Sequence, residues 1–248
     1  MSHHIVEVQD LHYTYPGETV ALQGVSFRIE HGEAVGIVGA NGAGKSTLLQ
    51  HLNGYLVPIR GTVRIGDYPL TKETVRQVRR TVGMVFQDPD DQLFMPTVYE
   101  DVAFGPLNLG LPPADIELRV AQALETVGAW HLRDRPPYRL SGGEKRAVAI
   151  ASVLSMSPDI LVLDEPTSNL DPRARRHLIA LLKSFHHTKI IATHDLDLVL
   201  DLCSRVIVIH EGRVRADGTV QAIFEDEALL EDSHLEKPLR MQACPVCG

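Results

Sequence analysis

The sequence lacks any segment that would cross or enter a membrane on its own. Its longest apolar runs, such as residues 160–163, are strand-sized and far short of the ~20 residues that span a bilayer. The N-terminus also lacks the charged segment followed by an apolar one that marks a secretion signal. We therefore expect a cytosolic chain that reaches any membrane through a partner.

Cysteine is scarce, with three residues at 203, 244 and 247. An odd number without a secretion signal argues against a disulfide framework. Cys244 and Cys247 form a C-x-x-C pair, which supplies half of a four-ligand zinc site. Two interpretations stay open: a tail with two reduced thiols, or metal ligands completed by His234 or by another chain.

Basic residues are outnumbered, since 24 Lys and Arg face 32 Asp and Glu and the net charge is −8. Binding the phosphates of nucleic acid requires an excess of basic residues, so nucleic acid is disfavoured as the main partner. The 248 residues are 44% hydrophobic and 23% charged, which is enough for one well-buried core. One domain with a subdomain fits better than two equal domains.

Short β-branched runs alternate with longer helical patterns, which predicts an α/β fold with a largely parallel sheet. Several of these runs are almost entirely apolar, as expected of strands covered on both faces. Residues 5–29 alternate instead, with a turn at Pro16-Gly17, and favour an antiparallel sheet. Glu211-Gly212 predicts a hairpin, and residues 44–52 a helix. The core strands are expected at 34–38, 82–86, 160–163, 190–193 and 206–209.

Residues from about 88 to 156 differ from the rest, with several prolines and then helical patterns at 116–127 and 143–154. We interpret this segment as a mostly helical subdomain inserted between two core strands. The main domain then covers residues 1–220. Residues 221–248 begin with a helix and end in an acidic stretch and the cysteine tail.

The clearest motif is a glycine-rich loop that matches G-x-x-x-x-G-K-[ST], with an apolar strand before it and a helix after it. Glycines let backbone N–H groups turn toward an anion, and the new helix points its N-terminus at the same place. The lysine adds a charge for phosphate oxygens, and the serine hydroxyl suits Mg²⁺. The loop therefore predicts an ATP and Mg²⁺ site at Gly39, Ala40, Asn41, Gly42, Ala43, Gly44, Lys45, Ser46 and Thr47.

Two acidic residues follow the apolar run 160–163 and supply groups that the glycine-rich loop lacks. Asp164 at the end of the strand can hold Mg²⁺ or its water shell. Glu165, the next residue, can polarise the attacking water as a general base.

A second helix start with phosphate-binding chemistry lies about a hundred residues after the first. Ser141 has the chemistry of an N-cap, and Gly142 and Gly143 allow close backbone approach. Leu140 to Glu144 resemble the signature motif of ABC ATPases, with Glu144 in place of the commoner glutamine.

Other residues resemble ABC motifs in the expected order. Gln87 resembles the Q-loop glutamine, Ser168 to Asp171 the D-loop, and His194 the switch histidine. Tyr15 resembles the aromatic residue that stacks on adenine, although Tyr13 would share its face of a strand. The resemblance covers residues 5–220 and implies a P-loop NTPase (RecA-like) core, an N-terminal antiparallel β subdomain and a mostly helical signature subdomain.

The resemblance also implies a head-to-tail dimer, either of two copies or with a sister ATPase. Each ATP would lie between the lysine loop of one subunit and the Ser141 helix of the other, with Asp171 nearby. Glu165, His194 and Lys45 would carry out hydrolysis, while Gln87 would sense the nucleotide and help hold Mg²⁺. Such a pair binds ATP, closes, and opens after hydrolysis.

The segment after Gln87 resembles ATPase subunits of energy-coupling-factor importers, and residues 104–110 and 140–146 resemble the cobalt and nickel branch. The resemblance implies integral-membrane partners and a peripheral position on the cytoplasmic face of the membrane. Leu93, Phe94 and Met95 are expected to line a groove for a partner helix, or else to belong to the subdomain core. The sequence does not name the cargo, so a vitamin or other micronutrient importer is an alternative. A non-transport ABC ATPase and a regulatory ATP sensor are the other classes considered.

Overall fold

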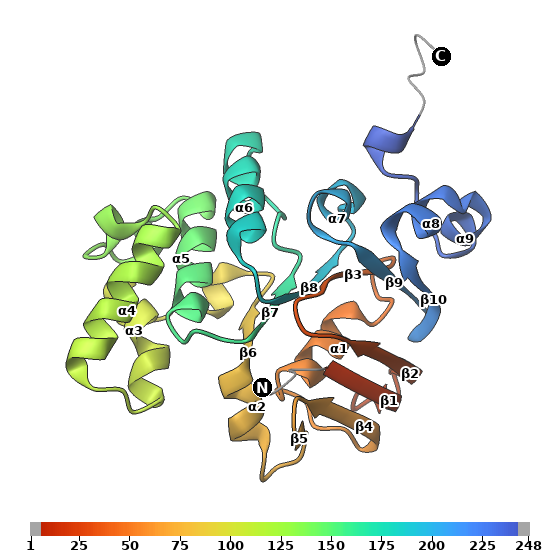
Figure 1. The fold of residues 1–248 in the computed structure, drawn as a ribbon, viewed down its shortest axis with the longest axis horizontal. Helices are drawn as coiled ribbons and strands as arrows, with labels where there is room; N and C mark the ends of the chain where they lie inside the picture. Colours follow the sequence, from red (N-terminus) through yellow and green to blue (C-terminus); the bar gives the residue numbers. More distant parts are fainter. Residues whose placement is uncertain (1–5, 243–248) are drawn as a thin grey trace.

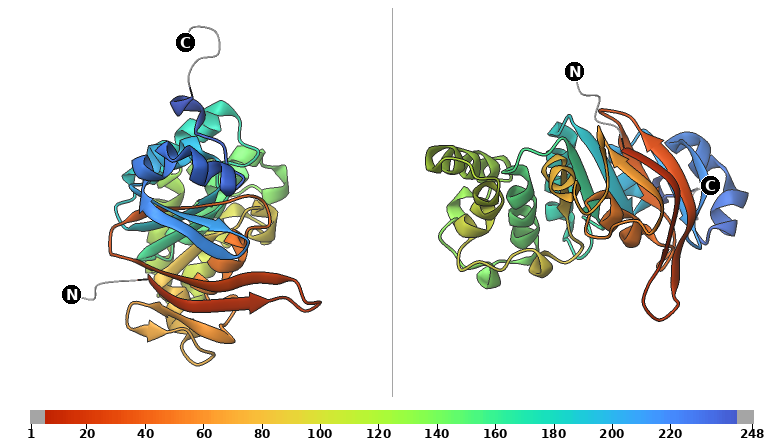
Figure 2. Two further views of the ribbon diagram at one scale, coloured as in Figure 1. Left: turned by 90° about the vertical axis from the view of Figure 1, so that its right-hand side faces the viewer. Right: turned by 90° about the horizontal axis from the view of Figure 1, so that it is seen from below.

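The computed structural model describes residues 6–242, folded around two β-sheets (Figure 1). Cys244 and Cys247 lie outside the described residues, so their two interpretations stay open. One sheet has four strands in the order β2-β1-β4-β5, and the other has six in the order β10-β9-β3-β8-β7-β6. Figure 2 shows the four-stranded sheet, in red and orange, as a separate layer beside the larger one.

The smaller sheet is antiparallel, as predicted for residues 5–29. Strands β1 (Val6–Thr14) and β2 (Val20–Ile29) pair antiparallel around the turn that contains Pro16 and Gly17, and Gly17 has a φ of 102°. Strands β4 (Arg60–Ile65) and β5 (Tyr68–Pro69) continue the sheet on the other side of β1.

The larger sheet has five parallel strands and one antiparallel edge strand. All five predicted core strands are confirmed and differ only at their ends. The hairpin at Glu211-Gly212 is also confirmed, because β10 pairs antiparallel with the strand before it. The strands are β3 (Ala34–Val38), β6 (Val82–Val85), β7 (Ile160–Asp164), β8 (Thr188–Thr193), β9 (Arg205–His210) and β10 (Arg213–Thr219).

Apolar helix faces cover both sides of the larger sheet, which explains its apolar strands. Helix α1 (Lys45–Leu52) lies between the two sheets and shares one hydrophobic core with them. Helices α6 (Pro172–Ser184) and α7 (Leu196–Leu202) pack on the opposite face. Helix α2 (Val75–Thr81) precedes β6, while α8 (Val220–Glu225), α9 (Glu227–Asp232) and the short turn η4 (Leu239–Met241) follow β10.

The inserted segment is helical, as expected, and has a hydrophobic core of its own. It stands at one side of the molecule, in green in Figure 1. Its helices are α3 (Val98–Asn108), α4 (Pro113–Thr126) and α5 (Gly142–Leu154), with single turns at Pro89–Asp91, Trp130–Leu132 and Pro137–Arg139. Its limits near 88 and 156 remain a prediction. Within residues 6–242, no helix has the length and apolarity that crossing a bilayer requires.

Gly83 on β6 lies where the side chain of Val153 of α5 packs directly on the sheet. A Cβ built there would overlap Val153 and lie 2.8 Å from Pro158. We expect Gly83→Ala to lower the free energy of unfolding by about 1–3 kcal/mol, because a packed core cannot admit the extra methyl group. Urea denaturation would measure the change.

Gly218→Ala is the matched control, since the new Cβ would lie 3.5 Å from Ile223, an ordinary contact. Because alanine suits a strand better than glycine, Gly218→Ala should leave the free energy of unfolding unchanged or raise it by up to about 1 kcal/mol. Equal stability of Gly83→Ala and the parent would contradict the tight packing of α5 on β6.

Candidate active site

The glycine-rich loop joins β3 to α1 and bends through left-handed glycines. Gly42 and Gly44 have φ values of 80° and 106°, and a Cβ on Gly44 would lie 2.5 Å from the carbonyl oxygen of Ala21. Helix α1 has no side-chain N-cap, so its first turn faces the loop without a capping group. A helix start wrapped by such a loop is suited to bind phosphate.

Lys45 folds back over this loop, where its Nζ donates to the carbonyls of Gly39 at 2.7 Å and Ala40 at 3.1 Å. The side chain is buried, and burial lowers the pKa of its amine while the charges of Glu165 and Asp164 oppose that shift. Lys45 therefore links the loop to the two acids at the end of β7.

Asp164 is buried at the end of β7 and hydrogen-bonds to the hydroxyl of Ser46. Burial raises the pKa of its carboxyl, and the neighbouring charge of Glu165 adds to that, whereas Ser46, Lys45 and Arg146 oppose it. Its Oδ1 atom is buried without a hydrogen-bond partner. A hydroxyl beside an unpartnered carboxylate oxygen is a donor set that fits Mg²⁺.

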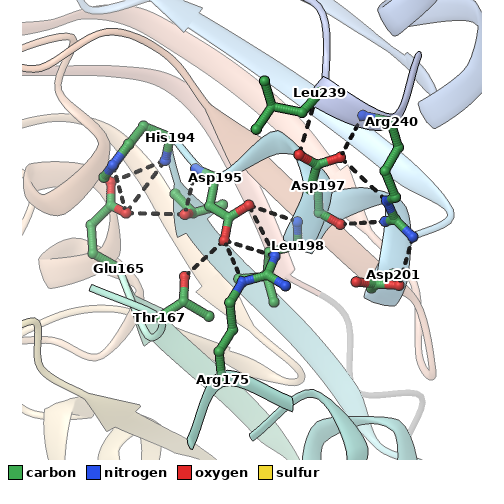
Figure 3. Close-up of polar contacts among 11 residues, drawn as sticks. Glu165, Thr167, Arg175, His194, Asp195, Asp197, Leu198, Asp201, Leu239 and Arg240 are labelled. Atoms are coloured by element: carbon green, nitrogen blue, oxygen red, sulfur yellow. Dashed lines mark hydrogen bonds and ion pairs between the residues drawn. The ribbon is translucent and has the colours of Figure 1, made fainter. Parts of the chain in front are cut away.

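Glu165 is held by the end of the neighbouring strand β8. Its carboxylate accepts from the Thr193 hydroxyl at 3.0 Å and from the backbone N–H of His194 at 3.1 Å. The Nδ1 atom of His194 lies 2.9 Å away, and the Nζ atom of Lys45 lies 4.0 Å away. The glutamate side chain is 7% exposed and the histidine 62%, so the pair runs from the interior to the surface (Figure 3).

Helix α5 begins with a capping box, of which the sequence analysis predicts the N-cap Ser141 but not the return contact of Glu144. Ser141 is the N-cap, as expected, and its backbone N–H donates to the carboxylate of Glu144 at 2.8 Å. The hydrogen bonds from Ser141 lower the pKa of Glu144. A Cβ on Gly142 would meet nothing within 4 Å, whereas one on Gly143 would lie 3.1 Å from Ala174 of α6. Gly142 therefore presents open backbone at this helix start.

Gln87 follows β6 with an exposed side chain, and its turn is fixed by a residue that sequence reasoning missed. Arg146 donates to the carbonyls of Phe86 at 2.7 Å and Gln87 at 2.6 Å. Arg146 lies on the buried face of α5, four residues before the apolar Ile150. A basic residue that falls on the apolar face of a helix is the sequence signal that could have identified Arg146.

Gln92 was missed as well. It accepts from the N–H of Phe86 and donates to the carbonyl of Ala149, so it also joins this turn to α5. The contact with Ala149 spans 57 residues of sequence, so no local pattern predicts it.

Two predicted nucleotide-binding residues have structural partners in the chain itself. The hydroxyl of Tyr15 lies 3.0 Å from that of Thr47, and its ring meets Tyr13 edge to face at 4.9 Å. Asp171 caps α6 by accepting from the N–H groups of Arg173 at 2.8 Å and Ala174 at 2.9 Å. Their contacts with ATP remain predictions.

The predicted residues thus fall into two groups. Lys45, Ser46, Asp164, Glu165 and His194 contact one another around the glycine-rich loop. The residues of the second helix start line two hollows: Ser141, Gly143 and Glu144 line one of about 810 Å³ together with Asp171, and Gly142 lines another together with Gln87.

Residues 22–168 match the family model described as ABC transporter. This chain belongs to the ABC transporter ATPase family. It is an ATPase that couples ATP hydrolysis to transport, and its predicted fold is confirmed. The roles of its individual site residues remain proposals.

Similar proteins are named as ATP-binding proteins of transporters. A Geobacter sulfurreducens protein assigned as an ABC transporter ATP-binding protein is 70% identical over 100% of both chains. The energy-coupling factor transporter ATP-binding protein EcfA1 of Methanospirillum hungatei is 48% identical over 95% of this chain and 87% of its own.

Among solved structures, cbiO1 from Clostridium perfringens, part of the ABC transporter complex cbiONQ, has a TM-score of 0.80 at 42% identity and covers 93% of this chain and 94% of its own. A dimeric ATP-binding cassette bound to ADP and Pi has a TM-score of 0.78 at 27% identity and covers 87% and 98%. The resemblance to energy-coupling-factor ATPases is therefore confirmed.

Replacing Lys45 tests the phosphate loop directly. We expect Lys45→Ala to weaken Mg-ATP binding by about 100-fold or more, because it removes a charge-assisted hydrogen-bond donor from a buried site. A fluorescent ATP analogue would measure the affinity. Lys72→Ala, at an exposed lysine, should bind as the parent does. Tight binding by Lys45→Ala would contradict the assignment of the loop.

Proposed function

We propose that this ATPase is one of a pair of subunits that energise an energy-coupling-factor importer whose cargo is cobalt or nickel. The observation that supports it most is the presence of two separate helix starts suited to anions, at Lys45 and at Ser141, of which Ser141 lines a hollow that does not include Lys45. A second subunit that faces the first would let one ATP contact the lysine loop of one chain and the Ser141 helix of the other.

Each residue of the cluster has a role in hydrolysis. Lys45 and the start of α1 bind the β- and γ-phosphates. Glu165 accepts the proton of the attacking water, and Thr193 and His194 hold its carboxylate in place. His194 also extends to the surface, where it can stabilise the γ-phosphate.

Ser46 and Asp164, with Gln87 from the neighbouring turn, are the residues that would hold Mg²⁺. When bound, the ion would offset the negative charge of the phosphates. Tyr15 would contact the adenine.

The open backbone at Gly142 supports the proposed dimer. Ser141, Gly142, Gly143 and Glu144 of one subunit would face the γ-phosphate bound at Lys45 of the other, with Asp171 beside them. ATP then binds the closed dimer better than the separate subunits, and its cleavage removes the link. Either a second copy or a sister ATPase can supply the other half.

A groove between the sheet and the helical subdomain would receive the membrane partner. It has a volume of about 1070 Å³. Phe94, 63% exposed, and Phe104 stack edge to face at 5.0 Å on its wall. Leu93 instead belongs to the core of the helical subdomain. The groove interpretation therefore applies to Phe94, and the core interpretation applies to Leu93. Binding there would hold the ATPase at the cytoplasmic face of the membrane.

The cargo is the part of the proposal that depends on resemblance alone. Residues 104–110 and 140–146 favour cobalt or nickel, and a vitamin or other micronutrient is the alternative. Within residues 6–242 no three His, Cys, Asp or Glu side chains gather as metal ligands, which is compatible with an ATPase that never touches its cargo.

Glu165→Gln tests the general base and the dimer together. The amide cannot accept the proton, so we expect the variant to bind Mg-ATP, to hydrolyse it at least about 100-fold more slowly, and to elute as a dimer in gel filtration with Mg-ATP. Hydrolysis at the parent rate would show that another residue is the base.

A second substitution separates the dimer from ATP binding. Adding Ser141→Arg to Glu165→Gln should spare ATP binding but remove the dimer, because the arginine blocks the helix start that faces the partner. A dimer that persists in the double variant would exclude Ser141 from the interface.

Uptake by cells tests the groove and the cargo. Deleting the gene should reduce uptake of radiolabelled cobalt or nickel, and Phe94→Asp with Phe104→Asp should fail to restore it while still binding ATP. Leu118→Asp, at an exposed leucine of α4, should restore it fully. Normal uptake by the groove variant would contradict docking there, and loss of vitamin uptake alone would favour the alternative cargo.

A further inference from the structure

Asp195, the residue after His194, has no role of its own in the proposed hydrolysis but is the centre of a polar network (Figure 3). It caps α7 by accepting from the N–H of Leu198 at 2.9 Å. Its two carboxylate oxygens also bind the guanidinium of Arg175, with Nε at 3.1 Å and Nη2 at 2.9 and 3.2 Å. A bidentate arginine–carboxylate pair fixes the relative orientation of the two side chains as well as the distance between them.

The same network continues to Glu165. The backbone N–H of Asp195 donates to the Thr193 hydroxyl at 3.0 Å, and that hydroxyl donates to the Glu165 carboxylate at 3.0 Å. The N–H of His194, one residue away, donates to the same carboxylate. A shift of Asp195 therefore moves the donors that orient Glu165.

At its other end, the network holds both sides of the turn at residues 168–171. Thr167, just before this turn, donates to Asp195 at 3.2 Å. Arg175 lies one turn into α6, whose N-cap is Asp171. Ser168 and Asn169 share a hollow with Gly142, the helix start that would meet the partner's nucleotide.

We infer that Arg175 and Asp195 are a positioning pair that aligns Glu165 with the turn at residues 168–171. Hydrolysis in one subunit then depends on where that turn lies against the partner. The inference rests on the proposed role of Glu165, and it adds two residues that no motif identifies. The pair acts through Thr193 and His194 and does not touch ATP.

A purely structural role would predict something different. Asp195 could serve only to keep the short helix α7 in place, as a second ion pair on the same helix does. Asp197 accepts from the Nε atom of Arg240 at 3.3 Å, and Asp201 accepts from its Nη1 atom at 3.2 Å. Figure 3 shows this second pair on the side of α7 away from Glu165. Arg240→Gln is therefore a matched control.

The test compares Arg175→Gln with Arg240→Gln in the full chain. Arg175→Gln should lower kcat by about 10- to 100-fold, the scale expected when a catalytic group is misplaced by about an ångström. Its KM for ATP and its affinity for a fluorescent ATP analogue should stay within about twofold of the parent, because the phosphate loop is unchanged. Arg240→Gln should leave kcat within about twofold of the parent, whatever its effect on Tm.

Two further variants keep the inference testable if Arg175→Gln folds poorly. Arg175→Lys retains the charge without the bidentate contact and should give a kcat between parent and Arg175→Gln. Asp195→Asn retains the helix cap and loses the charge, so it should match Arg175→Gln. Combining Arg175→Gln with Asp195→Asn should lower kcat no further than either change alone, because both changes break the same interaction.

Several outcomes would overturn the inference. It fails if kcat falls equally in Arg175→Gln and Arg240→Gln, or if Arg175→Gln raises KM with kcat unchanged. It also fails if Arg175→Gln and Asp195→Asn both turn over as the parent does. If Glu165→Gln is inactive in that last case, the proposed function stands without the positioning pair, and if Glu165→Gln is active, the proposed base is wrong as well.

Discussion

The fold holds three charged side chains in one buried place, and the rest of the site is arranged around them. Lys45, Asp164 and Glu165 are each at most 7% exposed. Burying charge is costly unless the groups are paired and hydrogen-bonded, and here the lysine sits near both acids while Ser46 and Thr193 bind one acid each. Such an arrangement contributes little to stability, and its charges fit the triphosphate and Mg²⁺ that we propose for this site.

The parallel sheet explains why these groups meet. The carboxyl ends of β3, β7 and β8 lie at one edge, and they deliver the glycine-rich loop, the two acids and Thr193 with His194. The strands are far apart in sequence but adjacent in the sheet, so register alone brings the residues together. Their completely buried apolar side chains keep that register fixed.

The sequence predicted this arrangement where the signal is local. Apolar runs located the five parallel strands, and the spacing of Gly39, Gly44 and Lys45 located the loop. Ser141 was predicted as a cap because capping depends on the next three residues. By contrast, Arg146 with Gln87 and Arg175 with Asp195 are pairs between distant segments, and only tertiary packing decides them. The same is true of Leu93 and Phe94, adjacent residues of which one is core and the other surface.

Helix α7 shows how such distant contacts place the residues of the candidate site. Its seven residues are too few to form a stable helix alone, so neighbouring elements must place it. Arg175 of α6 holds its first residues on one side, and Arg240 of the C-terminal segment holds it on the other. His194 directly precedes Asp195, the N-cap of this helix, and Glu165 hydrogen-bonds to His194. The placement of Glu165 beside His194 therefore depends jointly on β7, β8 and α6, and a partner that moves one of these elements would change it.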